Sequence, residues 1–141
     1  MIRYIFITLL SVFLGSTCAH AQDDAFVIDI TKVRVNEGEV VVEIYENQDS
    51  WMKTPLTVKR MPAGTDRLKV SLPLPYGRYG VAIYQDLDGD GEIDSNWLDI
   101  PKEPIGFGNN HRPFGSPDFK DCVIDFSPGY QAQTIKLYKV F

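Results

Sequence analysis

The chain concentrates its most distinctive chemistry in residues 86–94, where acidic side chains alternate with glycines and apolar residues. Carboxylates at positions 1, 3, 5 and 9, glycine at position 6 and an apolar residue at position 8 form the first part of a calcium-binding loop. A tight turn points side chains 1, 3 and 5 into one concavity, and Gly91 permits the backbone angle that a side chain would oppose. We therefore predict a metal site made by Asp86, Asp88, Asp90, Asp94 and the carbonyl of Glu92.

The spacing of these carboxylates favours a hard divalent cation. Without one, each close pair repels by about 1 kcal/mol in water and by about 4 kcal/mol at an effective dielectric constant of 20. Ca²⁺ fits better than Mg²⁺ because a flexible, all-oxygen loop can supply six to eight ligands. Zn²⁺ is disfavoured because one histidine, His111, and one cysteine, Cys122, lie far apart in the sequence. The alternative is a solvated acidic turn that holds no metal.

The loop departs from an EF-hand at position 12, where a bidentate glutamate is replaced by Trp97. Asp99 or the amide of Asn96 could supply the missing ligand, and the sequence leaves both open. We expect an affinity of about 10⁻⁵–10⁻⁴ M, which millimolar extracellular calcium would still satisfy. Because the loop follows a strand and has no helix before it, we expect the ion to stabilise the fold and not to act as a switch.

The elements that must position this loop are short strands with one apolar face. Apolar and polar residues alternate in seven runs, and the pattern predicts about seven strands. The runs are 26–31, 39–44, 56–60, 68–74, 79–84, 122–126 and 134–138. Such strands bury their apolar faces by stacking two sheets, so we predict an all-β, antiparallel β-sandwich of the immunoglobulin or prealbumin type, with a small barrel as the alternative. The turn at 36–38 further predicts a hairpin between the first two runs.

Residues 85–120 contain no clean strand and are predicted to form one long, ordered loop, since they are too aromatic for disorder. Asn109 and Asn110 could join a carbohydrate- or peptide-binding face with nearby aromatic residues. The alternative, which we favour, is that the aromatic side chains pack the loop onto the sandwich. The aromatic residues in question are Trp51, Trp97, Phe107 and Phe114.

The first 21 residues resemble an export signal. Arg3 supplies a positive charge, 4–14 is an apolar stretch too short to span a bilayer, and Ala19-His20-Ala21 fits a cleavage site. We therefore expect a signal peptide at 1–21, a β-sandwich domain at 22–141, and a periplasmic or secreted location. A lipoprotein anchored through Cys18 is a weaker alternative.

The amino-acid composition argues against two classes of partner, nucleic acids and membranes. The 141 residues include 19 acidic and 14 basic side chains, for a net charge of −5. That charge argues against nucleic acid and against electrostatic docking on anionic membranes, and no apolar run is long enough for a membrane span. Cleavage after residue 21 leaves His111, expected on a surface loop, and Cys122, expected as a buried and inert thiol. The only serine near His111 is Ser116, and no nucleophile elbow accompanies it.

Two segments around the acidic loop resemble a known family. Residues 74–86 read LPYGRYGVAIYQD, and residues 96–110 contain NWLDIPKEP and GFGNN. The chain resembles the DUF2141 family of exported bacterial proteins, whose pattern contains LP-x-G-x-Y-A-V-A, D-x-[ND]-x-[ND]-G-x-x-D, G-I-P-x-E and GFSNN. Asp99 and Gly108 stand where that family usually has Gly and Ser. The resemblance implies an exported prealbumin- or immunoglobulin-like sandwich with an EF-hand-like aspartate loop, and it implies little about activity.

These patterns favour an exported, calcium-stabilised binding or structural module, without assigned catalytic residues and with an unknown protein or glycan as its ligand. We expect a monomer. Two other hypotheses are a small, metal-dependent extracytoplasmic hydrolase and an adhesive or carbohydrate-binding surface domain.

Overall fold

The computed structural model describes residues 24–96 and 98–141, so the predicted signal peptide and Trp97 lie outside the described residues. Among the described residues, no helix has the length and apolar character needed to cross a bilayer. These residues form eight strands and two short 3-10 helices. The elements are β1 (Phe26–Thr31), β2 (Glu39–Tyr45), β3 (Thr57–Pro62), β4 (Arg67–Leu72), β5 (Gly77–Asp86), β6 (Ile105–Phe107), η1 (Gly108–Asn110), η2 (Phe119–Asp121), β7 (Val123–Phe126) and β8 (Gln133–Lys136).

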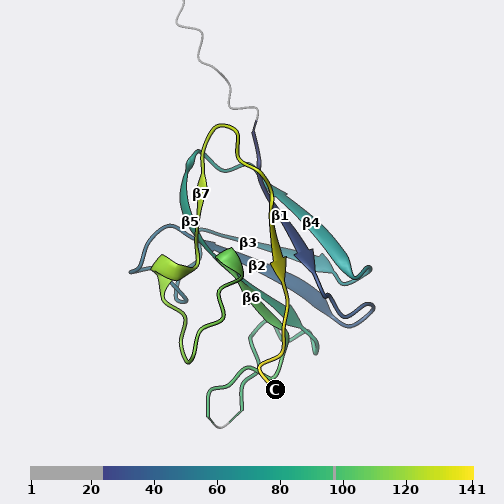
Figure 1. Ribbon diagram of the computed structural model, residues 1–141. Coiled ribbons are helices and arrows are strands. Elements are labelled where there is room, and N and C mark those ends of the chain that lie inside the picture. Colours follow the sequence, from purple (N-terminus) through teal and green to yellow (C-terminus); the bar gives the residue numbers. More distant parts are fainter. Residues whose placement is uncertain (1–23, 97) are drawn as a thin grey trace, which may run out of the picture.

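The strands form two sheets that face each other, which confirms the predicted β-sandwich (Figure 1). One sheet has the order β4-β1-β8, and the other has the order β3-β2-β5-β6, with β7 also paired to β5. All pairs are antiparallel except β1 with β8. The core lies between the sheets, where Phe26, Ile28 and Ile30 of β1 face Val40, Val42 and Ile44 of β2.

The predicted hairpin between β1 and β2 is wrong. β1 pairs with β4 and β8, whereas β2 pairs with β3 and β5. Their apolar faces pack against each other across the core, so the connecting residues carry the chain from one sheet to the other. That connection turns through Lys32, Asn36 and Gly38, which all have positive φ.

The larger sheet is buried on both faces. Val41 of β2 and Ala82 and Tyr84 of β5 point away from the first core, into a second apolar cluster. Trp51 and Phe107 belong to that cluster, and Trp51 donates a hydrogen bond of 2.9 Å from Nε1 to the carbonyl of Pro117. These aromatic residues therefore pack the 108–122 segment onto the sheet, as we favoured from the sequence. Phe114 does not, since its side chain is fully exposed.

Residues 85–120 are not one loop. Gln85 and Asp86 complete β5, and β6 pairs with Ala82, Ile83 and Tyr84 of that strand. The sequence did not predict β6 because three residues centred on Gly106 show no alternation. β7 also begins one residue later than predicted, so Cys122 packs in the second cluster, while Ile124 and Phe126 pack in the core between the sheets.

Candidate metal centre

Asp86 is the last residue of β5, and the fold buries its side chain to 1% exposure. Its two carboxylate oxygens accept hydrogen bonds from the amides of Gly89 (2.7 Å) and Gly91 (2.8 Å). Both glycines have positive φ, +77° and +84°, which side chains rarely adopt. The turn therefore wraps around the Asp86 carboxylate.

The Asp86 carboxylate is charged in this setting. Burial raises its pKa, but the amides of Gly91 and Gly89 and the Arg60 guanidinium favour the ionised form, and the net effect lowers the pKa below its ordinary value. Arg60 Nη1 lies 3.8 Å from Asp86 Oδ2. The same arginine and the Tyr84 hydroxyl donate to the Gly91 carbonyl, at 3.5 and 3.0 Å, and so hold the turn against the larger sheet.

The remaining loop carboxylates gather on the solvent side of the turn. Asp88, Asp90 and Asp94 each offer an oxygen within 4.8 Å of the others. Asp88 and Asp90 also accept hydrogen bonds from the amides two residues further along, at 3.2 and 2.8 Å. Glu92 is exposed, and its carboxylate belongs to neither acidic group of the described residues.

Glu103 is the functional candidate that our sequence analysis missed. It is 3% exposed, and its oxygens accept hydrogen bonds from the amides of Leu87 (2.7 Å) and Asp94 (3.1 Å). With Asp86 and Asp88 it forms a second group whose oxygens lie within 4.8 Å of one another. The glutamate of the family pattern G-I-P-x-E falls at this position and was the signal that could have identified it.

The two residues that we considered for position 12 have the following surroundings. Asn96 Oδ1 accepts hydrogen bonds from the amides of Leu98 (2.9 Å) and Ile100 (3.1 Å), so it organises a local turn. Asp99 is exposed and joins neither acidic group in the described part of the chain. The turn closes with Ser95 opposite Pro101, and this brings Glu103 back beside Asp94.

The electrostatics of Glu103 differ from those of Asp86. Burial and the nearby charges of Asp86 and Asp94 raise the pKa of Glu103, although the amides of Leu87 and Asp94 oppose the shift. Within residues 24–96 and 98–141, no lysine or arginine lies within ion-pairing distance of Glu103. The site therefore places two buried carboxylates side by side with one arginine on its edge, an arrangement that a divalent oxygen-binding cation would neutralise.

A cavity of about 450 Å³ adjoins the acidic loop. Its walls are mainly apolar and include Ile93, residues 98–101, Phe107, Pro113 and Tyr138. This volume lies within the range of small-molecule sites. One wall belongs to the same turn that joins Asp94 to Glu103.

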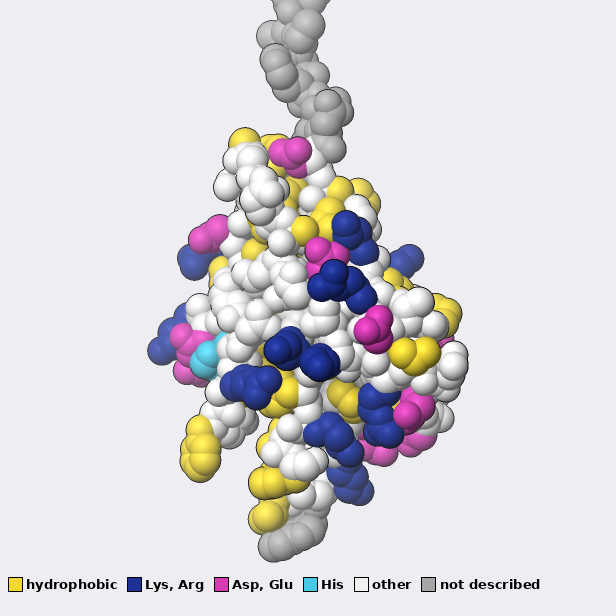
Figure 2. Space-filling view, turned by 45° about the vertical axis from the view of Figure 1, so that its right-hand side comes forward, with side chains coloured by type: hydrophobic (Ala, Val, Ile, Leu, Met, Phe, Trp, Pro, Cys, Tyr) yellow, Lys and Arg dark blue, Asp and Glu magenta, His cyan; other side chains and the backbone are white. Residues whose placement is uncertain are grey.

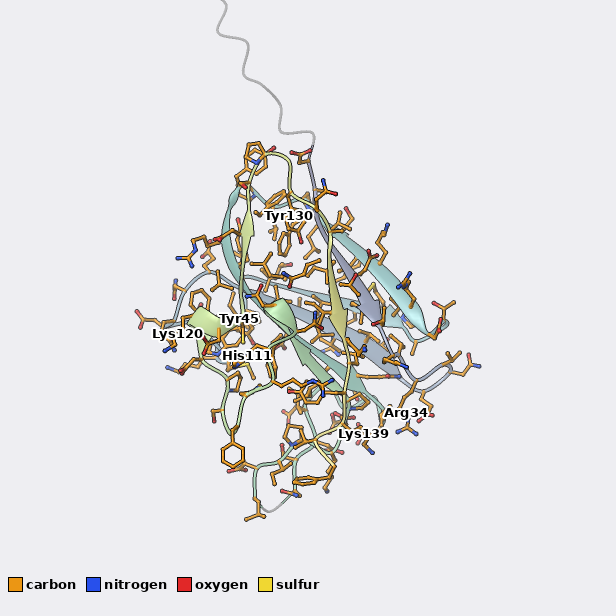
Figure 3. The ribbon with its side chains drawn as sticks, viewed as in Figure 1. Arg34, Tyr45, His111, Lys120, Tyr130 and Lys139 are labelled. Atoms are coloured by element: carbon orange, nitrogen blue, oxygen red, sulfur yellow. The ribbon has the colours of Figure 1, made fainter. Side chains whose placement is uncertain are left out.

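The other candidate groups for chemistry lie apart from the acidic loop. His111 Nε2 lies 3.9 Å from Asp121 Oδ2, and Figure 3 shows His111 and Lys120 on the flank opposite Arg34 and Lys139. No hydrogen bond connects the His111 side chain to a serine of the described residues. Cys122 is fully buried, and burial raises the pKa of its thiol to about 12, which makes it a poor nucleophile.

The family model described as "Uncharacterized protein conserved in bacteria (DUF2141)" matches residues 28–135, which include the acidic loop and Glu103. The chain belongs to the DUF2141 family. The family membership that the sequence motifs predicted is thus confirmed. No curated protein and no solved structure matches this DUF2141 chain.

Proposed function

We propose that this DUF2141 protein is an exported β-sandwich module, stabilised by calcium, that presents a binding or structural surface. The observation that carries the proposal is the position of Glu103. A buried carboxylate from outside the loop joins Asp86 and Asp88 and so supplies the acidic ligand that the loop lacks at position 12. Carboxylate and carbonyl oxygens are the donor set that Ca²⁺ prefers.

Burial gives the ion an energetic role. Removing a charged carboxylate from water is unfavourable unless it is paired. Asp86 has two backbone amides and one arginine at 3.8 Å, whereas Glu103 has only backbone amides. Ca²⁺ would offset the unfavourable burial of both charges. Its ligands would come from Asp86, Asp88 and Glu103, with Asp90, Asp94 and the carbonyl of Glu92 completing the shell on the solvent side.

The ion would also organise the segment that forms one wall of the cavity. The carboxylates that we assign to calcium lie before and after residues 95–102, and Lys102 donates its amide to the Asp94 carbonyl at 2.8 Å. Calcium bound at both ends would hold this segment in place and so keep the cavity open to a ligand. Calcium binding and ligand binding are then linked, since each favours the same conformation.

An exported protein would meet enough calcium to fill the proposed site. An affinity near 10⁻⁵–10⁻⁴ M is too weak for the cytosol but adequate at the millimolar concentrations outside it. The Arg3-containing segment and the Ala19-His20-Ala21 sequence support a cleaved signal and hence a periplasmic or secreted location. Edman sequencing of the protein from a periplasmic fraction would test this, and we expect Gln22 at the new N-terminus.

Thermal unfolding tests the role of calcium. We expect millimolar CaCl₂ to raise the midpoint by roughly 5–10 °C over EGTA, since a ligand at 10–100 times its dissociation constant adds about 1.4–2.7 kcal/mol. Asp88→Asn should abolish the shift, whereas Asp49→Asn, at an exposed turn outside the loop, should retain it. Equal midpoints in CaCl₂ and EGTA would contradict the proposal.

A further inference from the structure

Three strands align a row of polar side chains on the outer face of the smaller sheet. Thr31 of β1 is paired with Arg67 of β4 on one side and with Lys136 of β8 on the other. Ile30 and Ile135, the neighbours of Thr31 and Lys136, are fully buried, so alternation directs Thr31 and Lys136 outward. Adjacent strands lie about 4.8 Å apart, which places the threonine hydroxyl between two cationic side chains.

The turn after β6 adds a fourth group, the Arg112 guanidinium, to this row. The side-chain Nδ2 of Asn110 donates a hydrogen bond to the Thr134 carbonyl at 2.6 Å, and its Oδ1 accepts one from the backbone amide of Lys136 at 2.7 Å. These bonds fasten the turn to β8. They place Arg112 beside Lys136, and the Arg112 guanidinium lies 4.4 Å from the centre of the Tyr138 ring, which limits its movement.

The resulting depression has donors but no acid. It measures about 350 Å³ and is lined by Thr31, Asn110, Arg112, Thr134 and Lys136. In the described part of the chain, Arg67, Arg112 and Lys136 form no ion pair within 4.0 Å, and the hydroxyls of Thr31 and Thr134 make no hydrogen bond. Apart from the contact of the Arg112 guanidinium with the Tyr138 ring, these donors therefore have no partner among the described side chains.

Two aspartates, Asp29 and Asp66, flank this cationic row. Asp29, one row away, is 3.9 Å from Lys69, and Asp66 lines the adjoining depression together with Lys32 and Arg67. Figure 2, which brings the β4 side of the molecule forward, shows Lys and Arg side chains over the middle and lower part of this face. An acidic protein of net charge −5 thus presents a local cationic surface.

We propose that Arg67, Thr31, Lys136 and Arg112 form an anion-binding row that binds a sulfate or phosphate group carried on a polymer or free in solution. A tetrahedral oxyanion has oxygens on several sides and can accept hydrogen bonds from Lys136, Arg112 and the Thr31 hydroxyl at once. Arg67, about 10 Å from Lys136 across two strand spacings, can contact a second group of a linear polyanion. This site is separate from the acidic loop and does not depend on calcium.

The test measures binding of a sulfated polymer and of free ions to the whole protein in EGTA at low salt. Isothermal titration with dextran sulfate, inorganic sulfate and inorganic phosphate distinguishes the sources, and neutral dextran is the blank. We expect the double variant Arg112→Ala/Lys136→Ala to bind dextran sulfate about 2- to 25-fold more weakly, since each exposed charge contact contributes about 1.4- to 5-fold. Lys53→Ala/Lys59→Ala removes the same charge from exposed positions elsewhere and should change the affinity less than about twofold.

Each outcome decides the proposal. Binding of free ions as well as polymer supports a site for one oxyanion, and binding of polymer alone supports recognition of several groups along the row. Absence of binding to all three probes, or an equal loss in both double variants, would overturn the proposal. Thr31→Val keeps the β-branched shape of the strand and removes only the hydroxyl, so it should weaken binding without lowering the unfolding midpoint even if the double variant folds poorly.

Discussion

Glu103 Oε1 accepts a hydrogen bond of 2.7 Å from the amide of Leu87, a residue 16 positions earlier in the chain. Its other oxygen accepts from Asp94 at 3.1 Å. One buried carboxylate therefore holds both the beginning and the end of the acidic loop. The same carboxylate lies with Asp86 and Asp88 in a group of oxygens that could hold a metal ion, so in our proposal the fold of the loop and the binding of the ion depend on the same side chain.

Glu103→Gln should separate these two roles. The amide oxygen can still accept from one backbone amide, but the charge is gone, and we expect calcium affinity to fall at least about tenfold, as for loss of a charge-assisted contact of about 1.4 kcal/mol or more. Calcium titration calorimetry measures the change. Glu46→Gln, at an exposed position, is the matched control, and equal affinities of the two variants would argue against Glu103 as a ligand.

Gly38→Ala should destabilise the fold at the base of the acidic loop. Gly38 has a φ of +62°, and an added Cβ would lie 1.8 Å from the Asp86 carbonyl oxygen, so the end of β5 must move. We expect a loss of about 2 kcal/mol or more in urea unfolding. A Cβ at Gly64 meets nothing within 4 Å, so Gly64→Ala should lose less than about 1 kcal/mol; comparable losses would show that the close approach is unimportant.

Trp51 should contribute strongly to the packing of the 108–122 segment. Trp51→Phe keeps an aromatic ring beside Tyr45 and Phe119 but leaves the Pro117 carbonyl without its donor, and we expect a loss of about 1–2 kcal/mol with faster proteolysis of this segment. Phe114→Ala, at a fully exposed position of the same segment, should change stability by less than about 0.5 kcal/mol. Urea unfolding measures the stability of each variant, and limited proteolysis measures the rate at which the segment is cleaved. Equal stabilities and equal cleavage rates of the two variants would contradict this account.

The Cys122 thiol should resist modification in the native state. Burial raises its pKa from 9.0 to about 12, so at pH 8 both access and thiolate formation are suppressed. Because the native pKa is the higher one, this thiol contributes stability that is complete below pH 9 and is lost as pH rises from 9 towards 12. Reaction with a thiol reagent at pH 8 should require urea, and rapid labelling of native protein would refute the prediction.

The strands could be predicted because most of them bury one face. The residues of β1 alternate between buried and partly exposed, and that alternation is visible in the sequence. Pairing could not be predicted, since the pattern identifies the apolar face but not the sheet to which a strand belongs. In β2, Val40, Val41 and Val42 are all buried because Trp51 and Phe107 cover the outer face, which no local pattern reveals.

In the candidate site too, the features made by residues close together in the sequence could be predicted, and those made by distant residues could not. A turn at Asp86 could be predicted because its carboxylates and glycines lie within a few residues of one another. Glu103 could not be derived from that local spacing, since it reaches the loop only after the chain folds back through Ser95 and Pro101. The anion-binding row depends on strand register, which places Thr31 next to Lys136 although they are far apart in sequence.

Anomalous X-ray scattering from crystals grown in millimolar calcium tests the central claim most directly. We predict one strong peak with oxygens of Asp86, Asp88 and Glu103 at about 2.3–2.6 Å, the usual Ca²⁺–oxygen distance. Well-ordered carboxylates at these three positions with no ion between them would contradict the account.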